Sequence, residues 1–134
     1  KALNGEPITI AGDGSQYRNF IYVEDLAEGN VHALKRKARN KIYNLDGNEK
    51  VTIKQIAESI KKIVGNVKIE YTSARPGDFS GKDVSTELAE SELGWKPRIS
   101  FEEGLKRYIK WFKKDKEKKD KSWSRLDETL KSEL

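Results

Sequence analysis

The segment from Thr52 to Gly65 constrains the fold more than any other part of the chain, because it encodes one complete helix. Thr52 and Gln55 have the spacing of a capping box, in which two side chains satisfy free amides at a helix start. Gly65 supplies the C-terminal stop. The apolar residues recur at helical spacing and form one stripe: Ile53, Ile56, Ala57, Ile60, Ile63 and Val64. We therefore expect an amphipathic helix that covers one face of a core.

Short runs rich in β-branched residues lie on both sides of this helix and predict strands. Residues 8–11 and 67–71 alternate between apolar and polar side chains, while 20–23 and 42–45 are two further candidates. A turn is expected at residues 46–48. Strands mixed with helices in a short chain predict a small α/β (α+β) domain.

Three further helices are expected. The acids Glu24 and Asp25 suit a helix start. A shorter helix is expected over residues 85–93, stopped by Gly94, and Ser100 opens a last one. The first of these would turn Leu26, Ala27, Val31 and Leu34 inward, and the last would bury Phe101, Leu105, Ile109 and Phe112. The architecture is thus a few short strands and about four helices.

Composition narrows the class of protein. At 134 residues the chain suits one core, and its 37% charged residues predict a heavily charged surface around clustered apolar residues. The absence of Cys excludes disulfides and thiolate metal sites, and no metal site is expected. The lone His32 lies in a helix-like run, which favours a structural or surface role. No stretch is apolar enough for a membrane span, so a cytoplasmic location is expected.

The start of the chain suggests a piece of a longer protein. There is no Met anywhere, and Lys1 leads directly into residues that resemble the last turn of a helix with Gly5 as its cap. We therefore expect residues to precede Lys1 in the gene product.

Two loops carry the residues best suited to bind a nucleotide. Arg18 follows a glycine-containing loop, and Arg75 and Asp78 enclose Pro76 and Gly77. A guanidinium offers paired donors for a diphosphate, and a carboxylate accepts from the two hydroxyls of a ribose. Taken singly, each Arg is typical of a solvated surface, but the combination predicts a nucleotide site.

The Gly12-Asp13-Gly14 run resembles the start of a dinucleotide-binding fingerprint but does not complete it. Tyr17 stands where the third glycine belongs, and a strand is expected next instead of a helix. A tight loop between two strands is the better interpretation.

An ordered set of motifs resembles the C-terminal region of the extended short-chain dehydrogenase/reductase family, which includes UDP-glucose 4-epimerase and other nucleotide-sugar epimerases and dehydratases. The similarity covers about residues 1–112. It rests on Gly12-Asp13-Gly14, Gln16, Arg18, Phe20 to Ala27, Tyr43-Asn44-Leu45, Arg75-Pro76-Gly77-Asp78, Leu93-Gly94-Trp95, Pro97, Glu103-Gly104-Leu105 and Trp111.

The resemblance implies roles for individual residues. Arg18 and Arg75 would grip the diphosphate of a nucleotide sugar, and Asp78 would bind its ribose. Thr9 and Ala11, on the preceding strand, would lie near the base. The matches at Asp25 and Asn44 would be structural. Two positions depart from the family pattern: Asn19 replaces an Asp beside Arg18, which would loosen what holds that arginine, and Ser85 replaces an Asp that opens the short helix.

The catalytic half of the family pattern is missing. The family uses a glycine-rich NAD site and a Tyr-x-x-x-Lys pair, and none of the five tyrosines here has Lys four positions later. We therefore expect no catalytic residue, no bound cofactor and no Rossmann domain in this chain, with NAD belonging to the intact parent enzyme. There, hydride would pass from the sugar to NAD to give a keto-sugar, and in an epimerase it would return to the opposite face.

The end of the chain is highly charged. Residues 113–121 hold six Lys and three acids, with Asp115/Lys119 and Glu117/Lys121 at helical spacing. A solvated helix or flexible tail is favoured over a nucleic-acid tail, because no aromatic residues interrupt the run. An apolar stripe then resumes, which would dock onto this domain or a neighbouring subunit: Trp123, Leu126, Leu130 and Leu134.

Together these observations predict a nucleotide-sugar-binding domain over residues 1–112 and a charged helical extension over 113–134. The expected function is the substrate-binding part of an NAD-dependent epimerase similar to UDP-glucose 4-epimerase. The alternatives are the same part of a sugar-nucleotide dehydratase, or a stand-alone basic binding module. The expected partners are a UDP-sugar and the missing NAD-binding domain, and neither a membrane nor nucleic acid.

Overall fold

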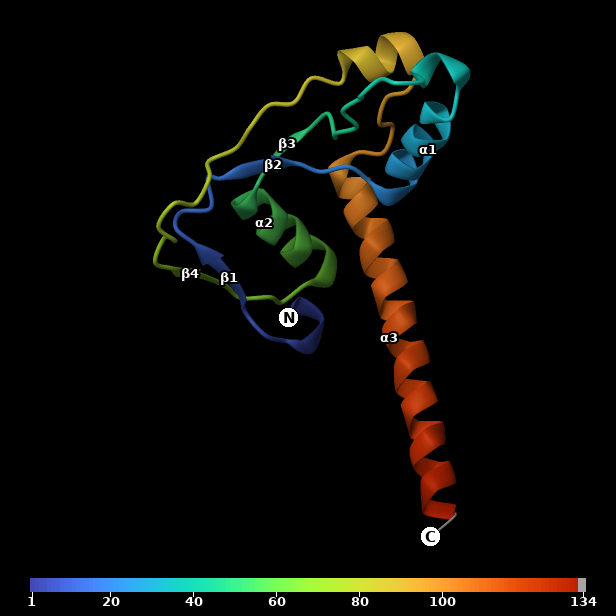
Figure 1. Cartoon of the computed structure of the whole chain (residues 1–134). Helices are drawn as coiled ribbons and strands as arrows, with labels where there is room; N and C mark the ends of the chain where they lie inside the picture. The colour runs from blue at the N-terminus through green and yellow to red at the C-terminus, as the bar shows by residue number, and fades with distance from the viewer. Residues whose placement is uncertain (133–134) are drawn as a thin grey trace. The chain divides into compact units, whose positions relative to one another are not determined.

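A computed structural model of the chain describes the backbone of residues 1–132 and the side chains of residues 1–119. The chain divides into two compact units, the first formed by residues 1–102 and the second starting at Glu103. The first unit contains every strand found in the described residues and the candidate site (Figure 1). The expected division into residues 1–112 and 113–134 remains a prediction.

Four short strands form two separate pairs. Strand β1 (Ile8–Ala11) runs parallel to β4 (Ile69–Thr72), and β2 (Tyr17–Asn19) runs antiparallel to β3 (Lys50–Thr52). The prediction for β1 is confirmed, and β4 begins two residues later than expected. The strand expected over residues 20–23 is wrong. The ladder ends at the Asn19–Lys50 pair, and the chain enters a helix at Val23.

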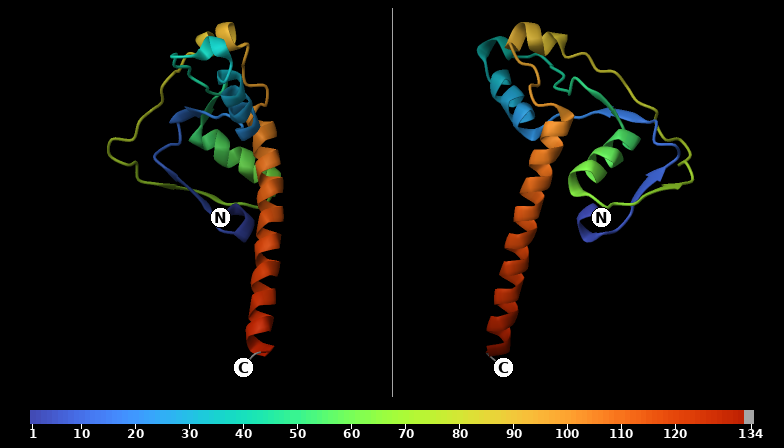
Figure 2. Two further views of the ribbon diagram at one scale, coloured as in Figure 1. Left: turned by 45° about the vertical axis from the view of Figure 1, so that its right-hand side comes forward. Right: turned by 180° about the vertical axis from the view of Figure 1, so that it is seen from behind.

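Helix α2 (Ile53–Val64) confirms the prediction from the capping box. The Gln55 amide donates to Thr52 Oγ1 at 3.1 Å, and the Thr52 amide donates to Gln55 Oε1 at 2.7 Å. Helix α2 contacts β1 and β3, and Figure 1 shows it beside both strands, with two further views of the ribbon in Figure 2. The buried residues of this region are Ile10, Val51, Ala57 and Val67.

Helix α1 (Val23–Ala33) buries the opposite face from the one expected. Val31 and Leu34 are 63% and 84% exposed, so the prediction that they point inward is wrong. The buried residues of this helix are Asp25 and Gly29. A Cβ atom added at Gly29 would lie 2.7 Å from Leu45 Cδ1 and 3.0 Å from the Trp95 ring. The inner face of α1 is therefore set by polar contacts and close packing.

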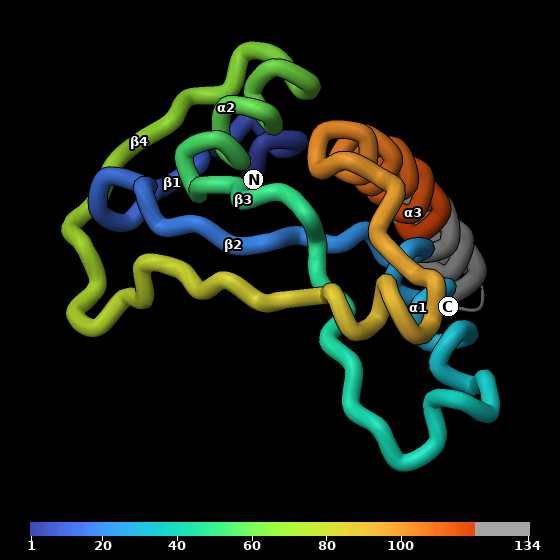
Figure 3. The backbone as a smooth tube through the Cα atoms, turned by 90° about the horizontal axis from the view of Figure 1, so that it is seen from above, coloured from blue at the N-terminus to red at the C-terminus, as the bar shows by residue number. Residues whose placement is uncertain are grey.

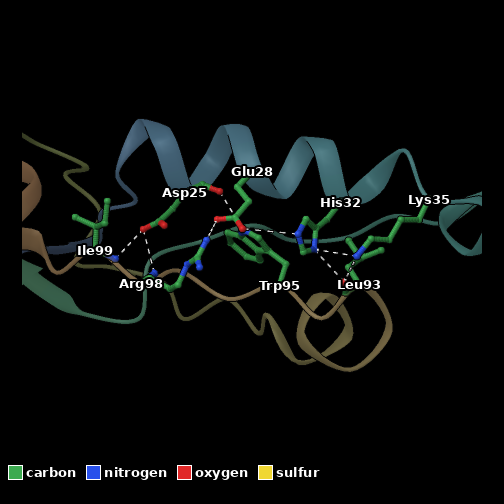
Figure 4. A network of polar contacts seen from close by, with 8 residues as sticks. All are labelled: Asp25, Glu28, His32, Lys35, Leu93, Trp95, Arg98 and Ile99. Atoms are coloured by element: carbon green, nitrogen blue, oxygen red, sulfur yellow. Dashed lines mark hydrogen bonds and ion pairs between the residues drawn. The ribbon is translucent and has the colours of Figure 1, made fainter.

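Asp25 and Trp95 connect α1 to the segment that precedes the last helix (Figure 4). Asp25 Oδ2 accepts hydrogen bonds from the backbone amides of Arg98 and Ile99, and Trp95 Nε1 donates to the Asp25 carbonyl at 2.9 Å. These bonds agree with the structural role expected for Asp25. Trp95 is 2% exposed and lies in a core cluster with Ala38, Ala89 and Leu93, against which Ile21, Tyr43 and Leu45 pack.

Other polar contacts between the same two segments involve His32. Its Nδ1 atom lies 3.0 Å from the Leu93 carbonyl oxygen, to which Lys35 also donates at 2.9 Å (Figure 4). His32 thus contacts the core cluster from α1, as expected for a structural histidine. The side-chain Nδ2 atom of Asn44 donates to the Ser85 carbonyl at 3.3 Å, which also agrees with a structural role.

Residues 42–45 are extended in pattern but form no strand, so that prediction is wrong. Tyr43 and Leu45 are half-buried against the Trp95 cluster, whereas Ile42 is 89% exposed. The alternation expected of a strand is present. A strand also needs a neighbour, however, and no strand of the described residues pairs with this segment.

Two of the remaining helical segments end at the glycines that were predicted to stop them. A 3-10 turn over Ala2–Asn4 ends at Gly5, and a π-helical turn over Ala89–Leu93 ends at Gly94, both glycines being left-handed. A second 3-10 turn covers Arg36–Ala38. Helix α3 (Phe101–Ser132) begins directly after Ser100.

Helix α3 runs through the charged segment, where Lys119 Nζ and Asp115 Oδ2 form the expected ion pair at 2.8 Å. The side chains of Lys121, Trp123, Leu126, Leu130 and Leu134 lie outside the described residues, so their predicted contacts stay predictions. Within the described part of the chain, no helix has the length and hydropathy that a membrane span requires.

We expect alkaline pH to weaken the fold through Tyr43. Its hydroxyl donates to Glu92 Oε2 at 2.5 Å, and this bond raises the pKa of Tyr43 from 10.0 to about 12. The folded chain therefore holds a proton that the unfolded chain releases, so the free energy of unfolding falls as the pH rises from 10 to 12. Urea denaturation at pH 9 and 11 of the parent and Tyr43→Phe measures this. An equal fall in both proteins would remove Tyr43 as the cause.

Candidate functional site

Two loops lie side by side at one edge of the β1–β4 pair. Because these strands are parallel, the chain leaves both of them at the same edge, into residues 12–16 and 73–86 (Figure 3). A Cβ atom at Gly12 would lie 3.4 Å from Ala74 Cβ, so the two loops are in close contact there. The predicted site residues Arg18, Arg75 and Asp78 lie on or next to these loops.

Arg75 and Asp78 enclose a tight turn. The Asp78 amide donates to the Arg75 carbonyl at 3.2 Å, and Gly77 between them has a φ of 75°. Pro at the second position and a left-handed Gly at the third are the signature of a type II turn. The turn keeps both side chains at its two ends, and both are exposed.

Gln16 joins the two loops. Its Nε2 atom donates to Asp78 Oδ2 at 2.9 Å and to the Ala11 carbonyl at 3.2 Å. Gln16 belongs to one of the sequence motifs, but no role was predicted for it. Its position two residues before Arg18 on an extended segment was the available signal, because such residues face the same side. Through Gln16, Ala11 and Asp78 belong to one hydrogen-bonded cluster.

Arg18 is held against the second loop. Its Nη1 atom donates to the carbonyls of Phe79 at 3.0 Å and Tyr17 at 2.6 Å, and its guanidinium carbon lies 5.7 Å from the centre of the Phe79 ring. Both bonds use Nη1, which leaves the edge formed by Nε and Nη2 for a ligand. The guanidinium is thus fixed through Nη1.

Asn19 does not take part in holding Arg18. Its Nδ2 atom donates to Asp46 Oδ2 at 3.1 Å, whereas the partners of Arg18 are backbone carbonyls and the Phe79 ring. The expected loosening of Arg18 by Asn19 therefore has no contact to support it in the described residues.

Thr9 and Arg75 are the site residues least connected to this cluster. Thr9 lies on β1 opposite Glu70 of β4, and its hydroxyl accepts from Lys1 Nζ at 3.4 Å. Within residues 1–119, no side-chain hydrogen bond ties Thr9 or Arg75 to Gln16, Arg18 or Asp78. The structure therefore links Ala11 to Asp78 through Gln16 and places Arg18 against Phe79, the residue after Asp78, with Arg75 at the start of the same turn.

The Gly12-Asp13-Gly14 loop has a structural explanation that needs no cofactor. Asp13 Oδ1 accepts from the Ser15 amide at 2.9 Å and its hydroxyl at 2.7 Å, bonds that lower the pKa of Asp13. A Cβ atom at Gly14 would lie 3.0 Å from Ile10 Cγ2. The chain then enters β2 instead of a helix whose N-terminus could take a pyrophosphate. As expected, this is a strand-to-strand loop, and these residues do not fit NAD.

Comparison with known proteins identifies the family. The family model described as GDP-mannose 4,6 dehydratase matches residues 1–108. The chain is 38% identical over 112 residues to the UDP-glucuronate 4-epimerase of Thermodesulfobacterium geofontis, covering 82% of this chain and 34% of that protein. The chain belongs to the extended short-chain dehydrogenase/reductase family of nucleotide-sugar epimerases and dehydratases. The resemblance read from the sequence motifs is thereby confirmed.

Further members of this epimerase/dehydratase family show the same partial match. A putative UDP-glucose 4-epimerase of Methanocaldococcus jannaschii is 36% identical over 114 residues, which is 84% of this chain and 36% of that protein. The chain thus spans about a third of the length of the curated relatives it matches.

Solved structures of two family members have the same fold over most of this chain. The UDP-glucose 4-epimerase of Thermotoga maritima, solved with UDP-glucose, gives a TM-score of 0.79 and 33% identity over 85% of this chain and 37% of that one. The dTDP-glucose 4,6-dehydratase of Bacillus anthracis, solved with NAD, gives a TM-score of 0.77 and 30% identity over 87% of this chain and 37% of that one. Both activities of the family are therefore represented among its structural neighbours.

Proposed function

We propose that this chain is the nucleotide-sugar-binding part of an NAD-dependent epimerase that acts on a UDP-sugar. Arg18 and Arg75 bind the diphosphate, Asp78 binds the ribose, and Thr9 and Ala11 lie beside the base. Binding the nucleotide, which is remote from the reacting carbon, holds the sugar in place for chemistry in another domain.

The observation that carries this proposal is the joining of the two loops. Arg18, on β2, contacts the Phe79 carbonyl, and Asp78 accepts from Gln16, so the guanidinium and the carboxylate are both held by contacts to or from the same loop. A diphosphate is bound well by a forked guanidinium, and a ribose needs a hydrogen-bond acceptor. Because Arg18 and Asp78 are already held in place, binding does not have to order these side chains. An Arg and an Asp that only face solvent would not be held by hydrogen bonds of this kind.

Exposed apolar side chains on α1 and in the segment that follows it support an NAD-binding domain as the protein partner. Val23, Val31, Leu34 and Ile42 are each more than 60% exposed, and Ile42 begins an extended segment that has no strand neighbour in the described residues. The curated relatives of this chain are about three times as long as the region that matches them. A domain that adds a strand at residues 42–45 would cover these side chains and bring NAD to the sugar.

A dehydratase parent is the second candidate. The matching family model carries the name of a dehydratase, and a dTDP-glucose 4,6-dehydratase is among the structural neighbours. Both reactions begin with oxidation of the sugar and use the same kind of nucleotide site. The choice of sugar and later steps would rest on residues of the NAD-binding domain.

The test is a titration of the full chain followed by NMR. We expect UDP-glucose and UDP-glucuronate to shift the amide signals of residues 12–18 and 74–79, with dissociation constants in the millimolar range. An unlabelled RNA oligonucleotide of equal charge serves as the competitor. Salt-sensitive binding of the RNA, with no shift caused by either nucleotide sugar, would favour a basic binding module and contradict the proposal.

We expect Arg75→Ala to weaken UDP-sugar binding by about 1.5–3 kcal/mol, the scale of a hydrogen bond to a charged group. Arg75 is exposed and contacts the turn only through its carbonyl, so its side chain can be removed without disturbing the fold. Lys82→Ala, which removes one positive charge from the same loop, is the matched control. If the two variants lost equal amounts of binding free energy, Arg75 would contribute only its positive charge and no specific contact with the diphosphate.

A further inference from the structure

We propose that Tyr17, Lys50 and Asp83 form a clasp that positions the loop carrying Arg75 and Asp78 for the nucleotide sugar. The inference rests on the proposed function and adds three positioning residues to its site. None of the three was predicted from the sequence.

The clasp joins three separate parts of the first unit. Tyr17 lies on β2, Lys50 on β3, and Asp83 on the loop that follows β4. The Tyr17 hydroxyl donates to Asp83 Oδ1 at 2.9 Å, and Lys50 Nζ donates to Asp83 Oδ2 at 2.8 Å. Lys50 Nζ also lies 5.4 Å from the centre of the Tyr17 ring. Each group therefore contacts the other two.

The loop needs such an anchor because it has little structure of its own. Residues 73–86 contain no helix or strand, and the turn from Arg75 to Asp78 is held by a single backbone bond. Loops of this length without regular structure are uncommon in compact domains unless they have a function. Figures 1 and 3 show this segment leaving β4 and passing the start of β2.

Gly81 provides a second, independent observation. Its φ is 151°, and a Cβ atom there would lie 2.4 to 2.6 Å from three carbons of the Tyr17 ring. The loop backbone thus passes directly over this ring, and a side chain at this position would force the ring or the loop to shift. One residue earlier, the Ser80 carbonyl accepts from the Tyr17 amide at 2.9 Å. Tyr17 holds the loop by its amide, its ring and its hydroxyl.

The ionisation of the three groups agrees with this geometry. The bonds from Lys50 and Tyr17 lower the pKa of Asp83, and the bond to Asp83 raises the pKa values of Lys50 and Tyr17. At neutral pH, Asp83 is therefore a carboxylate that accepts from a protonated Lys50 and a neutral Tyr17. At this pH a diphosphate is also fully charged.

Anchoring at Asp83 complements the contacts nearer the ligand. Gln16 holds the loop at Asp78 and Arg18 holds it at Phe79, but both of these residues are next to the proposed ligand. The clasp fixes the loop four residues beyond Phe79 through side chains with no proposed role in binding. Loss of the clasp should therefore loosen the loop without removing any ligand-binding side chain.

The test uses Tyr17→Phe in the full chain, because this change removes one hydroxyl and leaves the ring and the net charge. We expect hydrogen exchange at the residue-17 amide, which reports on docking to Ser80, to rise about fivefold, with the amides of α2 unchanged. We expect the dissociation constant for UDP-glucose to rise about three- to tenfold, the range for one hydrogen bond. Tyr108→Phe on α3 is the matched control and should change neither value.

Gly81→Ala provides a second variant that acts on the other side of the same contact. Its added methyl displaces the Tyr17 ring, so it should reproduce both changes while all three clasp side chains keep their hydrogen-bonding groups. Agreement of two chemically different variants supports positioning over a direct role of the hydroxyl.

Several results would overturn the inference, and they differ from failure of the proposed function. Unchanged UDP-glucose affinity in Tyr17→Phe, with a parent chain that binds, would show that the clasp does not position the site. Faster exchange spread equally over α2 would show general destabilisation in place of loop release. If the parent itself binds no nucleotide sugar, the proposed function fails first, and the positioning role falls with it.

Discussion

Trp95→Ala is expected to lower the free energy of unfolding by about 3–5 kcal/mol, the range for removing a fully buried large aromatic side chain. Trp95 is 2% exposed and is the largest side chain of the cluster formed with Ala38, Ala89 and Leu93. The substitution leaves a cavity between α1 and the 89–99 segment and removes the hydrogen bond to the Asp25 carbonyl. Urea denaturation followed by far-ultraviolet circular dichroism measures the loss.

Two variants separate the causes of that loss. Trp95→Phe keeps most of the ring and loses the Nε1 donor, so we expect about 1–2 kcal/mol. Trp111→Ala removes an indole that is 56% exposed and should cost far less. Equal losses for Trp95→Ala and Trp111→Ala would contradict the placement of Trp95 in the core.

Asp25→Ala is expected to lower the free energy of unfolding by about 2–4 kcal/mol, because two amides lose their acceptor in a buried place. Asp25 is 3% exposed, and its Oδ2 atom accepts from the Arg98 and Ile99 amides. These bonds fix the chain just before α3 begins at Phe101. Thermal unfolding of parent and variant by calorimetry gives the difference.

The matched control for this variant is Asp13→Ala. Asp13 also accepts two hydrogen bonds on one oxygen, but both come from Ser15 in an exposed loop. Water can replace those bonds, so the expected loss is much smaller. A loss as large as that of Asp25→Ala would mean that burial does not explain the effect.

Local signals in the sequence predicted the parts of the fold that depend on neighbouring residues. The Thr52–Gln55 capping box and Gly65 define both ends of α2, because caps act over one turn of chain. The glycine stops at Gly5 and Gly94 were predicted for the same reason. The Arg75–Asp78 turn also depends on only four neighbouring residues, but it was not predicted.

Pairing between distant residues explains the failures. The bounds of β2 depend on which of its residues meet β3, and residues 42–45 form no strand without a neighbour. For α1, the apolar spacing of Leu26, Val31 and Leu34 favoured the wrong inner face. The buried residues are Asp25 and Gly29, and Asp25 forms hydrogen bonds with Trp95 and with residues 98–99. A helix with a polar buried face cannot be recognised from periodicity alone.

The candidate site shows the same division. Arg18, Arg75 and Asp78 were predicted from residue type and motif, because the chemistry of a nucleotide selects guanidinium and carboxylate groups. The roles of Gln16, Phe79 and the clasp were not predicted. Each depends on hydrogen bonds between residues more than 30 positions apart in the sequence, which only folding brings together. Residue chemistry thus indicated what the site binds, and only the structure indicated what supports it.

The parallel pairing of β1 with β4 has a consequence for the order of folding. Ile8 pairs with Ile69, and Gln16 bonds Asp78 across 62 positions, so a large loop of chain must close before the two site loops meet. Contacts this distant in sequence form slowly compared with the local turns of α2. We therefore expect α2 to acquire protection early in refolding and the capacity to bind a nucleotide to arise only in the last kinetic phase.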